Sequence, residues 1–268
     1  MRALLRTMAV KRNSLRSILR FAFASGVFVV FLGFVELMRA WGVFPISIAA
    51  PSEIYKTFIA HADDLWFHLK PTLWATIIGY FFACTTAMAL AMLAVLVKRS
   101  EGIVYNFAVV IYSIPLIASA PILVMWFGVG STVRIIIAAI AGFFPVLVGA
   151  IQGLRAVDRQ AAELFHCLSA SKLQEFRLLA LPSALPYLFA GLKISAASAL
   201  LGAIISEWVG AEKGLGLMMA YALFSFNVAL VWLTLIVSII SAILAYSVVG
   251  LVEKWVVYWE RPAEMIAE

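Results

Sequence analysis

The sequence predicts an all-α integral membrane protein with about six transmembrane helices. Of its 268 residues, 65% are hydrophobic and 13% are charged, whereas about a quarter of the residues of a soluble domain are charged. The apolar residues gather in runs of about 20, the length that crosses a bilayer as a helix. A membrane β-barrel would instead show short segments of alternating polarity.

The first 20 residues carry six basic side chains and no acidic one, and an apolar run follows directly. A cleaved signal peptide would have a shorter basic region and a small-x-small site after the apolar run. The sequence therefore favours a basic cytoplasmic segment at 1–20, followed by an uncleaved first span at about 21–41.

Residues 42–72 are more polar and predict an external loop with a surface helix near 52–63. His61 and His68 are seven positions apart, so a helix would place them on roughly one face. A metal site needs further ligands, and the neighbouring sequence offers none in a matching pattern. Surface histidines are therefore the favoured interpretation.

Five further apolar runs predict spans at about 73–97, 103–127, 133–154, 187–209 and 228–252. Pro115 and Pro121 interrupt the third span, and the segment 215–226 could re-enter the membrane. Lysine and arginine are concentrated in 1–20, in the loop 155–186 and after the last span, which predicts that these parts and both termini are cytoplasmic. Residues 21–260 thus form one transmembrane domain, with a cytoplasmic tail at 261–268.

Several functions are disfavoured. The net charge of +6 comes from basic clusters beside apolar runs, the pattern of cytoplasmic loops rather than of a nucleic-acid surface. Cys84 and Cys167 fall in different settings, so a disulfide is not expected. The sequence has no glycine-rich phosphate loop, no catalytic set and no metal cluster, and we expect neither enzymatic activity nor a cofactor. If ATP drives this protein, another subunit must hydrolyse it.

The stretch 163–182 is too rich in polar side chains to cross a membrane. Its leucines and phenylalanines alternate with charges, as in two short amphipathic helices joined at Ser169-Ala170-Ser171. Pro182 and Pro186 are expected to end the second helix before the fifth span. The stretch could be a solvated connector on the lipid headgroups or a docking site for a cytosolic partner.

The same stretch resembles the cytoplasmic loop of permease subunits of binding-protein-dependent ABC importers. That loop reads Glu-Ala-Ala, three residues, Gly, nine residues, Ile-x-Leu-Pro, and here Glu163, Leu179, Leu181 and Pro182 match at the same spacing. Ser169 stands in place of the glycine, and Leu164 and Phe165 in place of the alanines. If Ser169 adopts a positive φ, it costs roughly 1 kcal/mol.

Further strings, in the same order, are similar to the nitrate, sulfonate and taurine branch of these permeases, which includes importers of pyrimidine vitamin precursors and riboflavin. They are Ser113-Ile114-Pro115, Trp126-Phe127-Gly128-Val129-Gly130, Phe143-Phe144-Pro145, Gly191-Leu192-Lys193, Glu207 and Gly214-Leu215-Gly216.

The resemblance implies a type I ABC importer permease fold with a cytoplasmic coupling-helix loop. It implies two permease copies, with a homodimer expected, two cytosolic ATP-binding subunits and an external solute-binding protein, in a bacterial cytoplasmic membrane. The ATPase-docking residues would be Glu163, Leu164, Phe165, Leu168, Ser169, Ala170 and Ser171.

Ionisable residues at membrane depth need a structural or functional reason. Glu207, near the external end of the fifth span, could face the translocation pathway, pair with a cation such as Arg134, or reach interfacial water. Lys193, at the cytoplasmic end of that span, is expected to extend toward the headgroups. The predicted pathway residues are Ser113, Ser119, Trp126, Phe144 and Glu207.

The favoured function is thus the transmembrane subunit of an ATP-driven importer of a small solute, of the sulfonate, nitrate, taurine or pyrimidine class. A self-sufficient secondary transporter or channel is the alternative, and a membrane-embedded enzyme is a more distant one. The loop 163–182 separates the first two, because a secondary transporter needs no docking helix.

Overall fold

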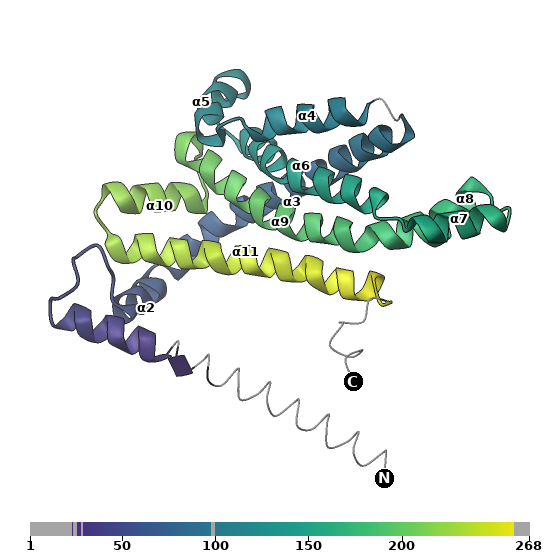
Figure 1. Ribbon diagram of the computed structural model, residues 1–268. Coiled ribbons are helices and arrows are strands. Elements are labelled where there is room, and N and C mark those ends of the chain that lie inside the picture. Colours follow the sequence, from purple (N-terminus) through teal and green to yellow (C-terminus); the bar gives the residue numbers. More distant parts are fainter. Residues whose placement is uncertain (1–22, 24–25, 28, 98–99, 260–268) are drawn as a thin grey trace, which may run out of the picture.

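The computed structural model describes residues 23, 26, 27, 29–97 and 100–259, and the described residues form helices without any β-strand (Figure 1). The first predicted span, 21–41, lies partly outside the described residues, and its residues 29–40 are helical. The remaining helices are α2 (Pro51–Ala60), α3 (Ala62–Leu96), α4 (Glu101–Tyr112), α5 (Leu116–Phe127), α6 (Ser131–Arg155), α7 (Arg159–Cys167), α8 (Lys172–Glu175), α9 (Leu181–Gly210), α10 (Leu215–Phe224) and α11 (Val228–Val256).

Four helical runs in the described residues are long and apolar enough to cross a membrane. These are Ala62–Ala94, Ser131–Arg155, Lys172–Gly210 and Val228–Val256. The first starts before the predicted span at 73–97, because Pro71 lies inside α3 without ending it. The predicted surface helix near 52–63 corresponds to α2.

The span predicted at 103–127 is broken near Pro115, one of the two prolines expected to interrupt it. Helices α4 and α5 meet at an angle of 87°. Pro115 adopts an extended conformation, with φ −65° and ψ 106°, at the N-cap of α5, and a residue before proline is disfavoured in the helical region. The bend therefore lies at Ser113–Pro115, whereas Pro121 is accommodated inside α5.

The prediction that Pro182 and Pro186 end the loop helix is wrong, because α8 continues into α9 through a π-helical segment, Phe176–Ala180. Proline at position 182 has no N–H for the carbonyl of Leu178, and its ring would press on that carbonyl in a regular α-helix. The wider turn, in which the N–H of Leu181 bonds the carbonyl of Phe176, relieves this clash. The helix thus continues instead of breaking.

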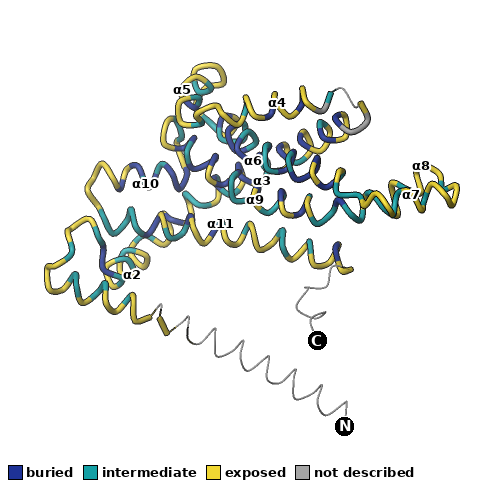
Figure 2. Tube along the Cα trace, in the orientation of Figure 1, coloured by how far each residue is buried: buried dark blue, intermediate teal, exposed yellow. Residues whose placement is uncertain are grey.

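Helix α6 is the centre of the bundle and packs between α3 and α9 (Figure 2). Its apolar core joins α3 and α4 at one end, through residues such as Val146 and Leu147, and α5 at the other end, through Val133 and Ile137. At Gly149 an added Cβ would lie 2.7 Å from the Tyr187 carbonyl, so the backbones of α6 and α9 touch directly. Such close approach of small residues is typical of helix packing in membranes.

Candidate functional site

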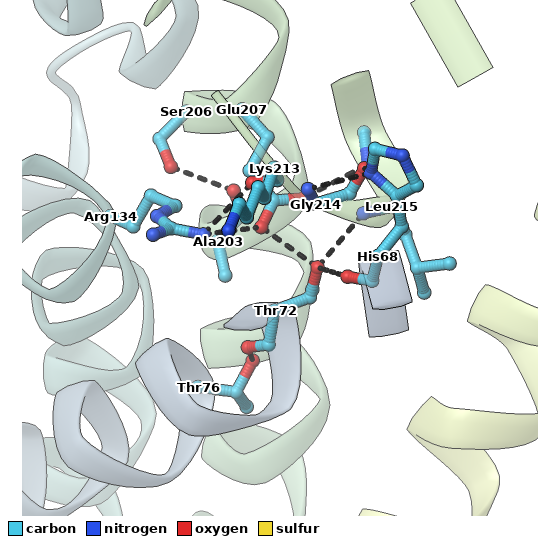
Figure 3. Close-up of polar contacts among 11 residues, drawn as sticks. His68, Thr72, Thr76, Arg134, Ala203, Ser206, Glu207, Lys213, Gly214 and Leu215 are labelled. Carbon is cyan, nitrogen blue, oxygen red and sulfur yellow. Dashed lines mark hydrogen bonds and ion pairs between the residues drawn. The ribbon is translucent and has the colours of Figure 1, made fainter. Parts of the chain in front are cut away.

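Two polar regions lie at opposite ends of the bundle. At one end, α7 and α8 project beyond the end of α11 (Figure 1). At the other end, the turn between α9 and α10 is held by buried side chains (Figure 3). We call the first region the loop projection, residues 158–175, and the second the polar hub, formed by His68, Thr72, Arg134, Glu207, Gly214 and Gly216.

In the loop projection, local hydrogen bonds fix two short helices, as the sequence predicts. The Asp158 side chain accepts a bond of 3.0 Å from the Gln160 amide and caps α7. Ser171 caps α8 in a reciprocal box with Gln174. Each cap satisfies amides that a helix N-terminus would otherwise leave without a partner.

Helix α7 ends at Cys167, and Ser169, two residues further on, has a φ of +53°. The Ala170 amide bonds the Phe165 carbonyl at 3.0 Å, and the Ser169 amide bonds the His166 carbonyl at 3.0 Å. A residue with positive φ after the last helical turn, together with such backward bonds, is the usual helix ending in which glycine is preferred. Ser169 therefore occupies the position where the resembling loops have glycine and adopts the strained conformation.

The proposed docking side chains are mostly exposed on α7. Leu164 and Leu168 are 58% and 70% exposed, one helical turn apart, whereas Phe165 is half-buried. Glu163 pairs with Arg159 at 3.2 Å, with both side chains largely in solvent. An exposed ion pair of this kind contributes little to stability, so Glu163 remains available to a partner.

Glu207 is the centre of the polar hub and is completely buried. Its Oε1 accepts a hydrogen bond of 2.8 Å from the Thr72 hydroxyl, and its Oε2 accepts one of 2.9 Å from the Gly216 amide. The Arg134 guanidinium is 3.6 Å from Oε1 and also donates to the Lys213 carbonyl at 2.9 Å. Of the three alternatives given for Glu207 by the sequence, the structure shows the pair with Arg134.

The hub holds the turn between α9 and α10 against α3. The Thr72 hydroxyl accepts a bond of 2.9 Å from the Leu215 amide, and the Gly214 amide donates to Nδ1 of His68 at 3.1 Å. At Gly214, with φ +146°, an added Cβ would collide with the Glu207 carboxylate. The carboxylate thus occupies the space that a side chain at position 214 would need, so glycine is required at that position.

The two histidines do not form a metal site. His68 bonds Gly214, and His61 lies 3.3 Å from the Asp64 carboxylate one turn away. Within the described residues no group of three potential ligands could hold a metal ion. His68 is half-buried and hydrogen-bonded to the turn between α9 and α10, whereas the sequence favoured a surface side chain.

Apart from Glu207 on α9, the predicted pathway residues lie at the end of α4 and on α5 and α6. Ser113 caps α4, Ser119 donates to the Leu116 carbonyl, and Trp126 is 71% exposed on α5. Phe144 stacks on Tyr112, with ring centroids 4.5 Å apart. Tyr112 lines a groove of about 200 Å³ between α4, α5, α6 and α9; it was not among the predicted residues, because nothing local distinguishes it from other aromatic residues of the span.

Long apolar helices, a bent helix pair and a projecting polar loop define this protein as an integral membrane protein. A family model described as "Binding-protein-dependent transport system inner membrane component" matches residues 75–258. The chain belongs to this family.

Individual relatives of the chain are also named as transport permeases. The formylaminopyrimidine transport permease protein ThiX of Halalkalibacterium halodurans is 31% identical over 86% of this chain and 95% of its own length. The riboflavin transport system permease protein RibX of Chloroflexus aurantiacus is 30% identical over 73% of each chain. The taurine transport system permease protein TauC of Escherichia coli is 26% identical over 66% of this chain and 67% of its own length.

Solved structures share the fold. An amino acid ABC transporter chain aligns with a TM-score of 0.62 and 16% identity, covering 74% of this chain and 96% of the other. A chain of the MetNI methionine ABC transporter, in an inward-facing conformation, aligns with a TM-score of 0.58 and 19% identity, covering 73% and 95%. The chain is therefore a permease subunit of an ATP-driven importer with the type I fold.

Proposed function

We propose that the loop projection carries, on part of its length, the surface on which a separate ATPase docks and through which it drives transport. The observation that carries this proposal is the pair of exposed leucines, Leu164 and Leu168, on a helix that projects away from the bundle. Exposed apolar residues spaced by one helical turn are the usual anchors of a helix that lies in a groove of a partner. The proposed contact surface is Glu163, Leu164, Phe165, Leu168, Ser169, Ala170 and Ser171.

This proposal sets the orientation in the membrane. The ATPase must be cytoplasmic to use ATP, so the loop projection and both termini lie in the cytoplasm, as the lysine and arginine bias predicts. The polar hub then lies at the external end, where a solute-binding protein delivers the solute. We propose an assembly of two copies of this chain and two ATP-binding subunits in a bacterial cytoplasmic membrane.

The translocation pathway in this proposal runs along α4, α5 and α6, past Ser113, Ser119, Trp126 and Phe144. The groove beside Tyr112 supports this placement, because it combines the aromatic ring of Tyr112 with the small polar side chain of Ser198. A place for Glu207 in the pathway stays a prediction. Its carboxylate is fully buried in this structure, so it would act on the pathway through the turn that it holds.

The solute is proposed to be a small organic molecule or anion of the pyrimidine, vitamin-precursor, sulfonate, taurine or nitrate class. The named relatives at 30 and 31% identity transport riboflavin and formylaminopyrimidine, which favours a heterocyclic solute. Binding measurements on the partner solute-binding protein, with members of each class as ligands, would decide between them.

Reconstitution in proteoliposomes tests the coupling. Uptake should require the ATPase, ATP and the solute-binding protein, and uptake that persists without ATP or ATPase would instead establish a secondary transporter.

Replacing Phe165 by Asp, or Glu163 by Arg, should abolish co-purification of the ATPase while the permease still inserts in the membrane. Leu173→Asp is the matched control, since Leu173 is 58% exposed but lies outside the proposed surface. Unchanged co-purification of both first variants would contradict the docking assignment.

A further inference from the structure

An ion pair joins α9 to α11 at the end of the bundle that carries the loop projection. The Lys193 ammonium donates to the Glu253 carboxylate at 2.7 Å, and the two side chains are 19% and 23% exposed. The same ammonium is 5.8 Å from the ring centroid of Tyr246. Lys193 therefore does not extend to the headgroups on its own, as its position in the sequence suggested. It makes a short, largely buried bond with a second helix, and bonds of this charged type are the stronger ones.

Lys193 of the pair lies on the helix that carries the loop projection. Lys193 is separated from the start of α9 at Leu181 by twelve residues, which is about 18 Å of helix. Helix α9 continues through the π-helical segment into α8, so no flexible joint of irregular chain separates Lys193 from the loop. Movement of the loop is thus carried along one helix to the level of Lys193.

The two neighbours of α9 hold it in different ways at this level. Gly191, two residues before Lys193, approaches the Pro145 carbonyl so closely that an added Cβ would be 2.5 Å away, so α6 is locked to α9 by backbone contact. The last turns of α11 pack less closely on α9: an added Cβ at Gly250 would come only within 3.8 Å of the Lys193 side chain, and Leu251, Val252 and Trp255 are all half-exposed or more. Within the described residues, no side-chain hydrogen bond other than the one between Lys193 and Glu253 connects α9 with α11.

We propose that the Lys193–Glu253 pair is a latch that makes the end of α11 follow α9 when the docked ATPase moves the loop. This inference rests on the proposed function of the loop. Lys193 and Glu253 are positioning residues, because they act through the two helices rather than on the solute. Without the latch, α6 and α9 still move together, but α11 stays behind and the movement opens the pathway incompletely.

The test compares a neutral pair with a reversed pair. The Lys193→Met/Glu253→Gln double variant removes the ion pair without leaving an unpaired buried charge. Such a replacement usually has little effect on the free energy of unfolding. We expect the amount of solute transported per ATP hydrolysed to fall by about tenfold. A factor of ten corresponds to about 1.4 kcal/mol, and the coupling energy of a close charge pair is larger than this. The reversed pair, Lys193→Glu/Glu253→Lys, should recover the ratio to within about threefold of wild type. Lys254→Gln, an exposed neighbour on α11, is the control and should leave the ratio unchanged.

A second measurement tests the tie itself, without ATPase or transport. Spin labels on Ala190→Cys and Trp255→Cys, in a chain with Cys84 and Cys167 replaced by alanine, report the distance between α9 and the end of α11. The distance distribution should be narrow in the parent chain and broad in the neutral pair. An equally narrow distribution, or an unchanged transport ratio in the neutral pair, would overturn the latch. If the parent chain shows no ATP-dependent uptake, the proposed function fails, and the label distances still decide whether the pair ties the helices.

Discussion

Ser169 adopts a backbone conformation that serine disfavours. Its φ of +53° lies in the left-handed region, which glycine adopts freely and serine adopts at a cost. The bond from the Ala170 amide to the Phe165 carbonyl holds it there. The strain is thus stored in the turn that we propose as part of the docking surface.

Replacing Ser169 by Gly should raise the free energy of unfolding of the purified chain by roughly 1 kcal/mol, because the folded turn loses its strain. Hydrogen exchange of the Ala170 amide, which reports the opening of this turn, should slow accordingly. Ser183→Gly is the control: Ser183 lies inside α9, where glycine lowers helix stability. Faster exchange in the Ser169 variant would show that serine fits the turn better than its φ indicates.

Glu207 and Arg134 illustrate what a buried charge requires. The carboxylate has three partners on three different parts of the chain, and it compensates the Arg134 guanidinium in surroundings where an unpaired charge is very unfavourable. The hub therefore links α3, α6 and the start of α10 through one side chain. Loss of either charge leaves the other one buried alone.

Arg134→Met or Glu207→Leu should each lower the free energy of unfolding by about 3 kcal/mol or more, whereas the double variant should lose clearly less than the sum of the two. Thermal unfolding in detergent, followed by tryptophan fluorescence, measures this difference. Arg159→Met is the control, because the Arg159–Glu163 pair is exposed and its loss should cost less than about 1 kcal/mol. Strictly additive losses would mean that Arg134 and Glu207 do not interact.

At the scale of elements, the joint between the loop projection and α9 depends on one proline. The π-helical segment inserts one extra residue per turn just before Pro182, and each residue of an α-helix turns the chain by about 100°. The segment therefore sets the direction in which α7 and its exposed leucines point relative to the bundle. A regular helix over the same residues would present a different face.

Pro182→Ala should allow Phe176–Ala180 to become a regular α-helix and so rotate the loop projection about the axis of α9. Spin labels on the exposed native Cys167 and on Ala190→Cys, with Cys84 replaced, should report a changed distance. Transport per ATP should fall while the chain still inserts in the membrane. Pro186→Ala is the control, since no π-helical turn precedes Pro186, and it should leave the label distance unaltered. An unchanged distance for Pro182→Ala would mean that contacts other than the proline maintain the π-helical turn.

The elements show which features the sequence could predict. Hydropathy places helices such as α6 and α11 well, because a bilayer imposes both composition and length. Pro182 and Pro115 behave differently: Pro182, expected to end the loop helix, is absorbed by a wider turn, whereas Pro115, expected to interrupt the third span, accompanies a bend of 87°. The local sequence indicates that a proline disturbs a helix, but it does not indicate whether the helix bends or continues.

The hub was predictable only in part for a similar reason. Glu207 and Arg134 stand out because charges are rare in membrane helices, and their pairing was one of the alternatives considered. Thr72 does not stand out, since a threonine in a span usually bonds its own backbone, and it lies 135 positions from Glu207. Contacts at such separations follow from the packing of α3 on α9, which a single sequence does not reveal.

At the scale of the whole molecule, the exposed surface of α5 shows where a second copy is expected. Ile117, Ile122, Met125 and Trp126 are all about half-exposed or more, and Met125 is 82% exposed. Lipid can cover such residues, but α5 is short, meets α4 at 87° and borders the groove beside Tyr112. A pathway that follows this groove needs a wall on its open side, and a symmetric second copy would supply it.

A single cysteine in place of Met125, in a chain without Cys84 and Cys167, should therefore form a disulfide or a short chemical crosslink between two copies in the membrane. The reason is geometric: near a two-fold axis, the same residue of each copy lies close to its counterpart. Ile243→Cys is the matched control, because Ile243 is 58% exposed on α11, away from α5, and should face lipid. Crosslinking at Ile243 but not at Met125 would place the contact between copies on α11, and the groove beside Tyr112 would then open toward lipid, which is incompatible with a pathway for a polar solute.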